Sequence, residues 1–459
     1  MTAIAELLKG EGARVTGSDV ADRFYTDELL ARIGITPLTG FSADHLPPET
    51  ELLVYSAAYG ADNPERVEAN RRGVPQVSYS EMLGSLSRTR LSLGVSGVHG
   101  KTSTAAMLGT MIAGSSLPAT VVVGSAVPSF GGSATLRQGR DILIAETCEY
   151  RRHFLTFHPA VAIITSVEQD HQDYYSDPAD IFDAFEEYAM RITSGGALVY
   201  CVDDDGAPGI AERIRRARKD LTMVPYGFSA DGPWRCQLLS VGSGRQLFTL
   251  GDSDSTWELA VPGRHMIANA AGAVAALTEL VRRYKHDEIA ERFESWRRQL
   301  ALFRGTRRRS EITAIIDGIT VIDDYAHHPT AIRATLAGFR EFYPGRRLLV
   351  DFMSHTFSRT AALLEQFGDA FPDADMVVLN DIYASAREHN THGISGDTLY
   401  REIAKHHPMV EYHPDFGSAT KRILEVLKPG DVLVTMGAGD NFRVGHGVVN
   451  ALRARTGME

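Results

Sequence analysis

The segment that begins at Leu91 constrains the fold of this chain more than any other. It reads LSLGVSGVHGKTSTAAMLGTM: an apolar run over 91–96, a turn with Gly97 and Gly100, and an apolar helix pattern from Lys101. A buried strand followed by a glycine turn and a helix is typical of a parallel α/β sheet, where the turn lies at the carboxyl end of the strand. The segment therefore predicts an α/β fold with a parallel central sheet.

The same turn has the chemistry of a phosphate-binding loop. Its glycines let backbone N–H groups close around an anion at the positive end of the helix. Lys101 can reach the β and γ phosphates of a nucleotide, and the Thr102 hydroxyl can bind Mg²⁺. Val95 stands where the full motif has its first glycine, so the match is to a shorter G-x-x-G-K-T form. The alternative is a glycine turn that only caps a helix, but the strand–loop–helix context favours phosphate binding.

Strand and helix patterns alternate on both sides of this segment and predict three domains. We expect a Rossmann-like N-terminal domain over 1–86, a central domain over 87–303 with an ATPase-like parallel sheet, and a Rossmann-like C-terminal domain over 304–459. The strand candidates RRLLVDF, ADMVVLND and DVLVTMG are nearly continuous in apolar residues, which indicates a sheet covered on both faces. The local features expected are a helix over 1–9, strands over 13–19, 51–56 and 74–80, a linker over 86–90, an antiparallel flap over 222–259 and a hairpin turn at Asp317–Gly318.

Composition excludes several classes of function. A net charge of −11 argues against nucleic acid as the main partner, because phosphate neutralisation needs basic patches. The three cysteines have no CxxC spacing, so neither a disulfide framework nor a zinc site is expected. We find no apolar run of about 18 residues and no signal peptide, so we expect a cytoplasmic protein without membrane insertion.

Acidic and histidine side chains follow the strands next to the glycine turn. Glu146 closes the strand DILIAE and can hold Mg²⁺ at a strand end, although an ordinary surface acid is an equal alternative and Glu149 competes for the role. The segment TSVEQDHQDYY offers His171, a type of residue that is more often structural after a strand. Its place on a neighbouring strand end raises the hypothesis of a second metal. The other polar candidates of that segment are Glu168, Asp170 and Asp173.

Three further polar clusters lie in the last third of the chain. The run VIDDYAHHP either coordinates a metal or, as we favour, is a polar strand end that faces a substrate. FRGTRRRSE is basic, and such a run is usually a solvated face but can clamp phosphates at a domain junction. MSHTFSRT adds His355 and Arg359 after a buried strand.

Taken in order, these motifs resemble the Mur ligase family over nearly the whole chain. The order is G-x-x-G-K-T, a strand-end Glu, E-x-D-H, G-R-H-x-x-x-N, F-x-G-x-x-R-R and D-D-Y-A-H-H-P. Within the family, GVHGKT, DDYAHHP, SHTFSRT and DIYASARE are similar to the branch that joins L-alanine to UDP-N-acetylmuramate. The resemblance implies an ATP- and Mg²⁺-dependent acid–amino-acid ligase of peptidoglycan synthesis, and we expect a monomer or weak homodimer.

The resemblance also implies roles for individual residues. Those expected at the ATP phosphates are Gly97, His99, Gly100, Lys101, Thr102 and Ser103. Thr102 and Glu146 are expected to hold one Mg²⁺ and His171 a second. His265 and Asn269 are expected near adenine, with Arg308 and Tyr325 also toward the nucleotide. The residues expected at the substrates are Ser18, Asp19, Ser56, Arg309, His327 and His355. The expected catalytic residues are Lys101, Glu146, His171, His327 and Arg359.

The chain departs from the family pattern at several points. The family has a strand and a G-x-G-G-x-G turn before the position of Met1, and that turn helps to bind UDP, so we expect a start assigned too late or a truncated chain. The other departures are Val98 for Thr, Met266 for Asn, Thr356 for Arg and Ser166 for Asn. The alternatives are a Mur-type or folylpolyglutamate-like ligase for tripeptide or another amino acid, a nucleotide-binding homologue without catalysis, and, least favoured, a phosphate-loop transporter ATPase or GTPase.

Overall fold

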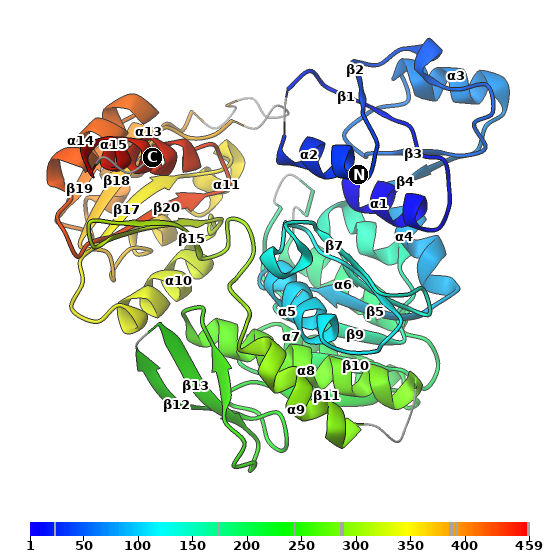
Figure 1. Cartoon of the computed structure of the whole chain (residues 1–459). Helices are drawn as coiled ribbons and strands as arrows, with labels where there is room; N and C mark the ends of the chain where they lie inside the picture. Colours follow the sequence, from blue (N-terminus) through cyan, green and yellow to red (C-terminus); the bar gives the residue numbers. More distant parts are fainter. Residues whose placement is uncertain are drawn as a thin grey trace. The chain divides into compact units, whose positions relative to one another are not determined.

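The computed structural model describes residues 1–459 except 23, 172–173, 176, 243, 285–288, 385–389, 391–392 and 457–459. Its internal contacts divide the chain into two compact units. Figure 1 labels their helices and strands along the chain. The first unit comprises Met1–Val167, Phe182–Pro225 and Gly272–Gln299. The second comprises Glu168–Ile181, Tyr226–Ala271 and Leu300–Glu459.

The N-terminal segment of the first unit alternates short strands and helices. The elements are α1 (Thr2–Gly10), β1 (Ser18–Asp19), α2 (Tyr25–Arg32), β2 (Leu38–Thr39), η1 (Ala43–His45), β3 (Leu53–Tyr55), α3 (Pro64–Arg72), β4 (Gln76–Ser78) and α4 (Tyr79–Arg88). β1 pairs with β2 and β3 with β4, both in parallel. The predicted helix and α/β alternation are confirmed, although the strands are shorter than predicted.

The predicted linker over 86–90 is wrong in its first half, because α4 continues to Arg88. The helix begins just after Ser78, whose hydroxyl accepts a hydrogen bond from the backbone N–H of Glu81 at 3.2 Å. The Glu81 carboxylate accepts one in return from the backbone N–H of Ser78 at 2.7 Å. This capping box fixes the start of the helix inside the predicted strand 74–80.

The rest of the first unit is built on a seven-stranded sheet in the order β11-β10-β9-β5-β8-β6-β7. Its strands are β5 (Leu91–Ser96), β6 (Ala119–Val122), β7 (Thr135–Arg137), β8 (Ile142–Glu146), β9 (Val161–Ile164), β10 (Ala197–Cys201) and β11 (Thr222–Tyr226). The helices are α5 (Lys101–Ala113), η2 (Pro128–Phe130), η3 (Tyr150–Thr156), α6 (Pro178–Met190), α7 (Ala207–Ala217), α8 (Arg264–Tyr284) and α9 (Ile289–Leu300). The first residues of α6, up to Ile181, and of α8, up to Ala271, belong to the second unit. β5 lies between β8 and β9 and is parallel to both. α5 is buried from Thr102 to Ile112, as its apolar sequence requires.

The predicted antiparallel flap is confirmed only from Cys236 onward. Its three strands are β12 (Cys236–Gly242), β13 (Arg245–Leu250) and β14 (Trp257–Leu259), in antiparallel pairs within the second unit. The predicted start at 222 is wrong, because β11 belongs to the edge of the seven-stranded sheet instead. The strand is short and its sequence does not distinguish the two sheets.

The C-terminal part of the second unit is a six-stranded sheet in the order β15-β16-β20-β17-β18-β19. Its strands are β15 (Glu311–Ile316), β16 (Ile319–Asp324), β17 (Leu348–Met353), β18 (Met376–Leu379), β19 (Val410–Tyr412) and β20 (Val432–Gly437). Its helices are α10 (Pro329–Phe342), α11 (Phe357–Ala362), α12 (Leu364–Gly368), α13 (Gly396–Ile403), α14 (Phe416–Val426) and α15 (Phe442–Thr456). Only β15 is antiparallel to its neighbour.

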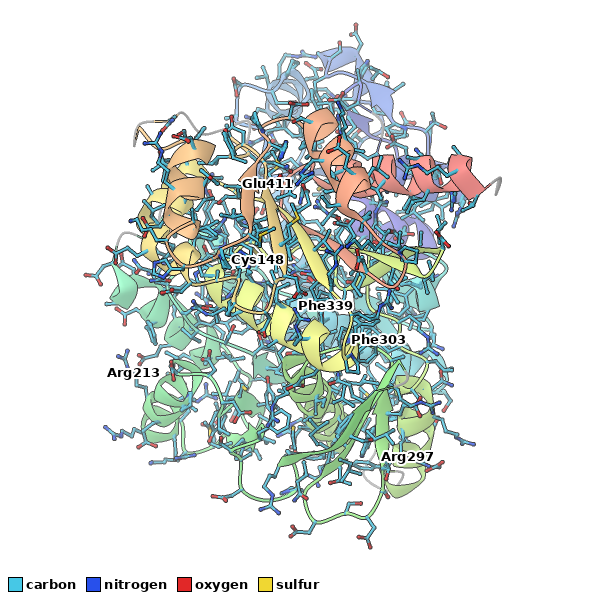
Figure 2. The ribbon with its side chains drawn as sticks, turned by 90° about the vertical axis from the view of Figure 1, so that its left-hand side faces the viewer. Cys148, Arg213, Arg297, Phe303, Phe339 and Glu411 are labelled. Atoms are coloured by element: carbon cyan, nitrogen blue, oxygen red, sulfur yellow. The ribbon has the colours of Figure 1, made fainter. Side chains whose placement is uncertain are left out.

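Both faces of this sheet carry an apolar layer, as predicted. Phe339 of α10, labelled in Figure 2, is fully buried in the layer on one face. Val448 of α15 is fully buried in the layer on the other face. The hairpin between β15 and β16 is also confirmed: Asp317 has φ +50° and Gly318 φ +73°, the left-handed pair that a tight two-residue turn requires.

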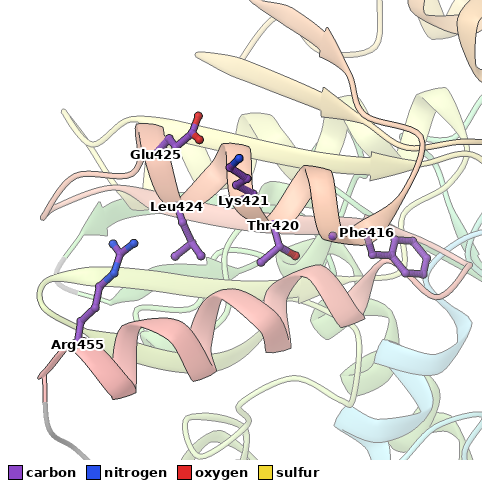
Figure 3. Close-up of a pocket in the computed structure, with 7 residues that line it drawn as sticks. Phe416, Thr420, Lys421, Leu424, Glu425 and Arg455 are labelled. Atoms are coloured by element: carbon purple, nitrogen blue, oxygen red, sulfur yellow. The ribbon is translucent and has the colours of Figure 1, made fainter.

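A groove of about 670 Å³ lies between α14 and α15 (Figure 3). Thr420 and Leu424 point from α14 toward α15, and Arg455 closes one end. None of the residues predicted to bind nucleotide or substrate lines it. Among the described residues, no helix is long and apolar enough to cross a membrane.

Candidate functional site

The predicted phosphate loop connects β5 to α5 in the first unit. Gly97 has φ +137°, and a Cβ on it would lie 2.0 Å from the Thr165 hydroxyl oxygen, so only glycine fits. Gly100 has φ +80° and directly precedes the first residue of α5. The loop therefore places backbone N–H groups at the positive end of a buried helix, the arrangement that binds anions.

The two residues that follow β9 hold this loop in place. The backbone N–H of His99 donates to the Ser166 hydroxyl at 2.8 Å, and that of Val98 donates to the Ser166 carbonyl at 3.0 Å. The hydroxyl of Thr165 donates to the His99 carbonyl. These three hydrogen bonds fix the loop to the residues that follow β9.

Lys101 lies at the start of α5 and is nearly buried. Its ammonium donates to the carbonyls of Gly97 and Val98 and lies 2.9 Å from a carboxylate oxygen of Glu149. Burial lowers the pKa of Lys101, but the charge of Glu149, with help from Glu146, more than offsets this, so the pKa lies above its usual value. The lysine is a cation in the protein.

Glu146 and Glu149, which compete for one role in the sequence, have different contacts. The Thr102 hydroxyl donates to Glu146 at 3.0 Å, and the backbone N–H of Gly124 donates to the other Glu146 oxygen at 2.7 Å. Glu149 contacts Lys101 instead. Thr102 and Glu146 are the pair that offers two oxygen ligands side by side, so the geometry favours Glu146 for Mg²⁺.

The residues predicted to bind UDP lie in the N-terminal segment of the first unit. Ser18 and Asp19 form β1, and Ser56 directly follows β3. Two polar residues that the sequence did not signal lie beside them. The Ser18 hydroxyl is 3.1 Å from His45 Nδ1, and the same nitrogen is 3.5 Å from a Glu65 carboxylate oxygen.

In the second unit, the ends of β16 and β17 carry a cluster of rings. Tyr325 and His327 follow β16, and their ring centroids are 5.2 Å apart. His355 follows β17, with its ring 6.1 Å from that of His327. Tyr383, which the sequence did not single out, stacks on His355 at 5.4 Å. β16 and β17 both pair with β20, so their carboxyl ends meet at one edge of the sheet.

A buried ion pair lies beside these rings in the same unit. Arg359 of α11 donates to the Asp170 carboxylate through Nε at 3.0 Å and Nη2 at 2.7 Å. Burial would raise the pKa of Asp170, but the Arg359 charge outweighs it and holds that pKa well below the usual range. His171 follows directly, with φ +56°. Asp173 lies outside the described residues.

His327 is neutral at physiological pH. Burial lowers its pKa well below the usual value, and the Arg359 cation lowers it further. Its Nδ1 is 2.7 Å from the carbonyl oxygen of Tyr325, an acceptor, so Nδ1 carries the hydrogen. The lone pair is therefore on Nε2, and the ring can accept a proton there.

The predicted arginine pair makes structural contacts. Arg308 donates to the Asp323 carboxylate at 3.0 Å and to the Gly437 carbonyl at 2.8 Å. Arg309 lies over the Tyr325 ring at 4.7 Å. Arg308 thereby fixes the strand end that carries Tyr325, and its contact with a nucleotide stays a prediction.

The two residues predicted near adenine lie in the first turns of α8, in the second unit. His265 lies over Gly263, which has φ +101°, and Asn269 is buried one turn further on. Gln246 of β13, which sequence reasoning missed, donates to the carbonyls of Val261 and Gly263. Gln246 is fully buried, and its two hydrogen bonds fix the loop that precedes His265.

The structure brings two sets of the predicted residues together, and Ser18, Asp19, Ser56, His265 and Asn269 lie on or next to other elements. The first unit brings together Gly97, His99, Gly100, Lys101, Thr102, Ser103 and Glu146. The second brings together Tyr325, His327, His355 and Arg359 with the segment that holds His171. Part of the motif DIYASARE lies outside the described residues, since 385–389 are not described.

Comparisons with known proteins identify the family of the chain. Three family models match: "Mur ligase family, catalytic domain" over residues 1–91, "Mur ligase middle domain" over 95–277 and "Mur ligase, glutamate ligase domain" over 308–439. The UDP-N-acetylmuramate–L-alanine ligase of Treponema pallidum is 46% identical over 451 residues, which cover 98% of this chain and 94% of that protein. The ligase of the same name from Desulfitobacterium hafniense is 38% identical over 98% of this chain and 97% of its own length.

A solved structure has the same fold. The UDP-N-acetylmuramate-alanine ligase of Thermotoga maritima superposes with a TM-score of 0.79 at 23% identity, covering 99% of this chain and 97% of its own. With three family models in order along the sequence and relatives that match almost end to end, this chain belongs to the Mur ligase family.

Proposed function

We propose that this protein joins the lactyl carboxylate of UDP-N-acetylmuramate to the amine of L-alanine at the expense of ATP, in the synthesis of peptidoglycan precursors. The observation that carries the proposal is the Thr102–Glu146 pair beside Lys101, at neighbouring strand ends of a chain 46% identical to a ligase of this name. We also expect a cytoplasmic enzyme that acts as a monomer or weak homodimer, which sedimentation can test.

The residues present fit the magnesium ion that such a reaction needs. Thr102 and Glu146 offer a hydroxyl and a carboxylate oxygen 3.0 Å apart, and Mg²⁺ prefers oxygen ligands of this kind. An ion held there would offset negative charge on the nucleotide phosphates. His171 as the holder of a second Mg²⁺ stays a prediction, because imidazole is an uncommon ligand for this ion.

The first step forms an acyl phosphate. A lactyl carboxylate oxygen attacks the γ-phosphorus of ATP, the bond from that phosphorus to the bridging oxygen breaks, and ADP leaves. Lys101 offsets the charge of the transferred phosphoryl group. The loop N–H groups at the start of α5 hold the phosphates in position, and positioning supplies most of the catalysis in phosphoryl transfer.

The second step forms the amide. The L-alanine nitrogen attacks the carbonyl carbon of the acyl phosphate, the carbon–oxygen bond to phosphate breaks, and one proton leaves the nitrogen. His327 is suited to accept this proton, because its ring is neutral and its Nδ1–H is held by the Tyr325 carbonyl. Arg359, on α11 after β17, is suited to bind an anionic group of the substrate.

The remaining predicted residues complete the proposal. His265 and Asn269 are placed in the first turns of a helix and are proposed to contact adenine, with Gln246 fixing the loop before them. Ser18, Asp19 and Ser56 are proposed to contact the UDP part of the substrate. Arg309 and His355 are proposed to contact the rest of that substrate.

Amino-acid-dependent release of ADP tests the proposal. The full chain is incubated with ATP, Mg²⁺ and UDP-N-acetylmuramate, and then with L-alanine, D-glutamate or murein tripeptide in turn. We expect ADP release with L-alanine and loss of that release in Lys101→Ala. Release with tripeptide or D-glutamate but not L-alanine, or an unchanged rate in Lys101→Ala, would refute it.

A further inference from the structure

A buried ion pair joins the phosphate loop to the segment after β8. The Lys101 ammonium lies 3.0 Å from one carboxylate oxygen of Glu149 and 2.9 Å from the other. Glu149 is only 2% exposed and Lys101 13%. The two residues lie 48 positions apart in the sequence, so the contact depends on the sheet that brings β5 and β8 together.

The hydrogen-bonding capacity of Lys101 is already used in this arrangement. An ammonium group has three N–H donors. The acceptors around it are the carbonyls of Gly97 and Val98 and the carboxylate of Glu149. A phosphate oxygen can therefore bind Lys101 only if it replaces one of these acceptors.

The carboxylate is the acceptor that a phosphate group most directly replaces. Both groups are anions, and two anions near one ammonium repel each other in a site shielded from water. The loop carbonyls are fixed, because the Ser166 and Thr165 contacts hold the backbone next to them. Exchange of one anion for another keeps the buried lysine paired throughout, whereas an unpaired buried cation is costly.

We propose that Glu149 is the positioning residue that holds Lys101 before a nucleotide binds, and that the β and γ phosphates of the nucleotide compete with its carboxylate for the ammonium. This inference rests on the proposed binding of ATP at the loop. It separates the two neighbouring acids: Glu146 contacts the Thr102 hydroxyl, and Glu149 contacts the lysine.

Calorimetric titration of the full chain with nucleotide alone tests the inference. The variants are Glu149→Gln, which removes the charge and keeps the shape, and Glu149→Asp, which keeps the charge and shortens the side chain. Glu187→Gln is the matched control, because it removes a carboxylate paired with Arg191 and Arg152 elsewhere in the same unit. The ligands are ATP, ADP and AMP, and each protein is titrated well below its melting temperature.

We expect Glu149→Gln to bind ATP and ADP about threefold to tenfold more tightly than the parent, the effect of removing one competing ion pair. AMP lacks the phosphates that reach Lys101, so its affinity stays unchanged. Glu149→Asp is intermediate, and the control binds all three nucleotides like the parent. At saturating substrates we expect the turnover of Glu149→Gln to fall, because the carboxylate no longer holds Lys101 in position. The KM for ATP also falls, because the carboxylate no longer competes with the phosphates.

Two results overturn the inference. One is an ATP affinity of Glu149→Gln that equals or falls below that of the parent. The other is a change that is as large for AMP as for ATP, which indicates a general effect on the fold. If Glu149→Gln does not fold, Glu149→Asp decides by the same criteria. Failure of the parent to bind ATP at all is a different result, because it refutes the proposed function as well.

Discussion

Replacing Asp351 with asparagine should stabilise the protein, and by several times more at pH 8 than at pH 4.5. Asp351 lies on β17 at the centre of the C-terminal sheet and is fully buried. Burial raises the pKa of Asp351 to about 7, although the side-chain amides of Asn380 and Asn441 both donate to its carboxylate. The nearby acid Asp323 raises it further.

The sign of the effect follows from linkage. Between the usual pKa of 3.8 and the folded pKa of about 7, the folded chain keeps a proton that the unfolded chain has released. The free energy of unfolding therefore falls as pH rises through this window, and the cost is complete above about pH 7. At 1.36 kcal/mol per pKa unit, a shift of roughly three units gives an upper limit of about 4 kcal/mol.

Asparagine at this position keeps the shape and removes the charge. The side-chain oxygens of Asn380 and Asn441 are buried and have no hydrogen-bond partner among the described residues, so either amide can turn and accept a bond from the amide introduced on β17. We expect Asp351→Asn to gain about 1–4 kcal/mol at pH 8 but at most about 1 kcal/mol at pH 4.5, which is only about 0.7 unit above the usual pKa of 3.8.

Scanning calorimetry of both proteins from pH 4.5 to 8.5 measures this. Tryptophan fluorescence is unsuitable, because the three tryptophans are Trp234, Trp257 and Trp296 and none lies in the C-terminal sheet. For a unit of this size each kcal/mol corresponds to roughly 2–4 °C in Tm. Asp254→Asn, an exposed site in the same unit, is the control for loss of one charge. A Tm difference between Asp351→Asn and parent that is the same at both ends of the pH range would refute the reasoning.

Three more predictions test the site. Gly97→Ala places a methyl group 2.0 Å from the Thr165 hydroxyl oxygen, so we expect at least about tenfold weaker ATP binding by titration, and parent-like binding would contradict the loop geometry. Asp170→Asn leaves Arg359 buried without its carboxylate, so we expect the free energy of unfolding in denaturant to fall by about 3–5 kcal/mol. A fall below about 1 kcal/mol would show that the pair is not buried in solution. Gln246→Ala releases the carbonyls of Val261 and Gly263, so we expect a higher KM for ATP with little change in kcat. A fall in kcat alone would count against the role of Gln246 in fixing the loop before His265.

The elements that the sequence predicted correctly are those whose conformation is determined by residues close together in the chain. The glycines before Lys101 require left-handed backbone, and the apolar helix after them has no exposed face, so the strand–turn–helix unit is recognisable in one stretch of sequence. The turn at Asp317–Gly318 is equally local. The flap and the linker were partly misplaced because β11 and the end of α4 are decided by tertiary neighbours and not by their own residues.

Contacts between distant residues could not be predicted in this way. Asp170 and Arg359 lie 189 positions apart, and no periodicity links them. Asp351 reads as one polar residue in a buried strand, and only the packing of Asn380 and Asn441 against it shows that the position is fully buried and hydrogen-bonded. Such pairs are specified by the register of strands in a sheet, which the sequence of each strand leaves open.

The two cations on which the proposed reaction depends are both held by buried carboxylates in this structure. Lys101 contacts Glu149 in one unit, and Arg359 contacts Asp170 in the other. A buried cation without a partner is costly, so a site built to bind an anionic substrate needs a resident anion while the substrate is absent. A carboxylate beside such a cation therefore serves as its counter-ion. It is assigned as a metal ligand only when other contacts, such as a neighbouring hydroxyl, support that role. This is why spacing alone favoured Glu146 but left Glu149 as a competitor, and why the Thr102 hydroxyl, 3.0 Å from Glu146, separates the two acids.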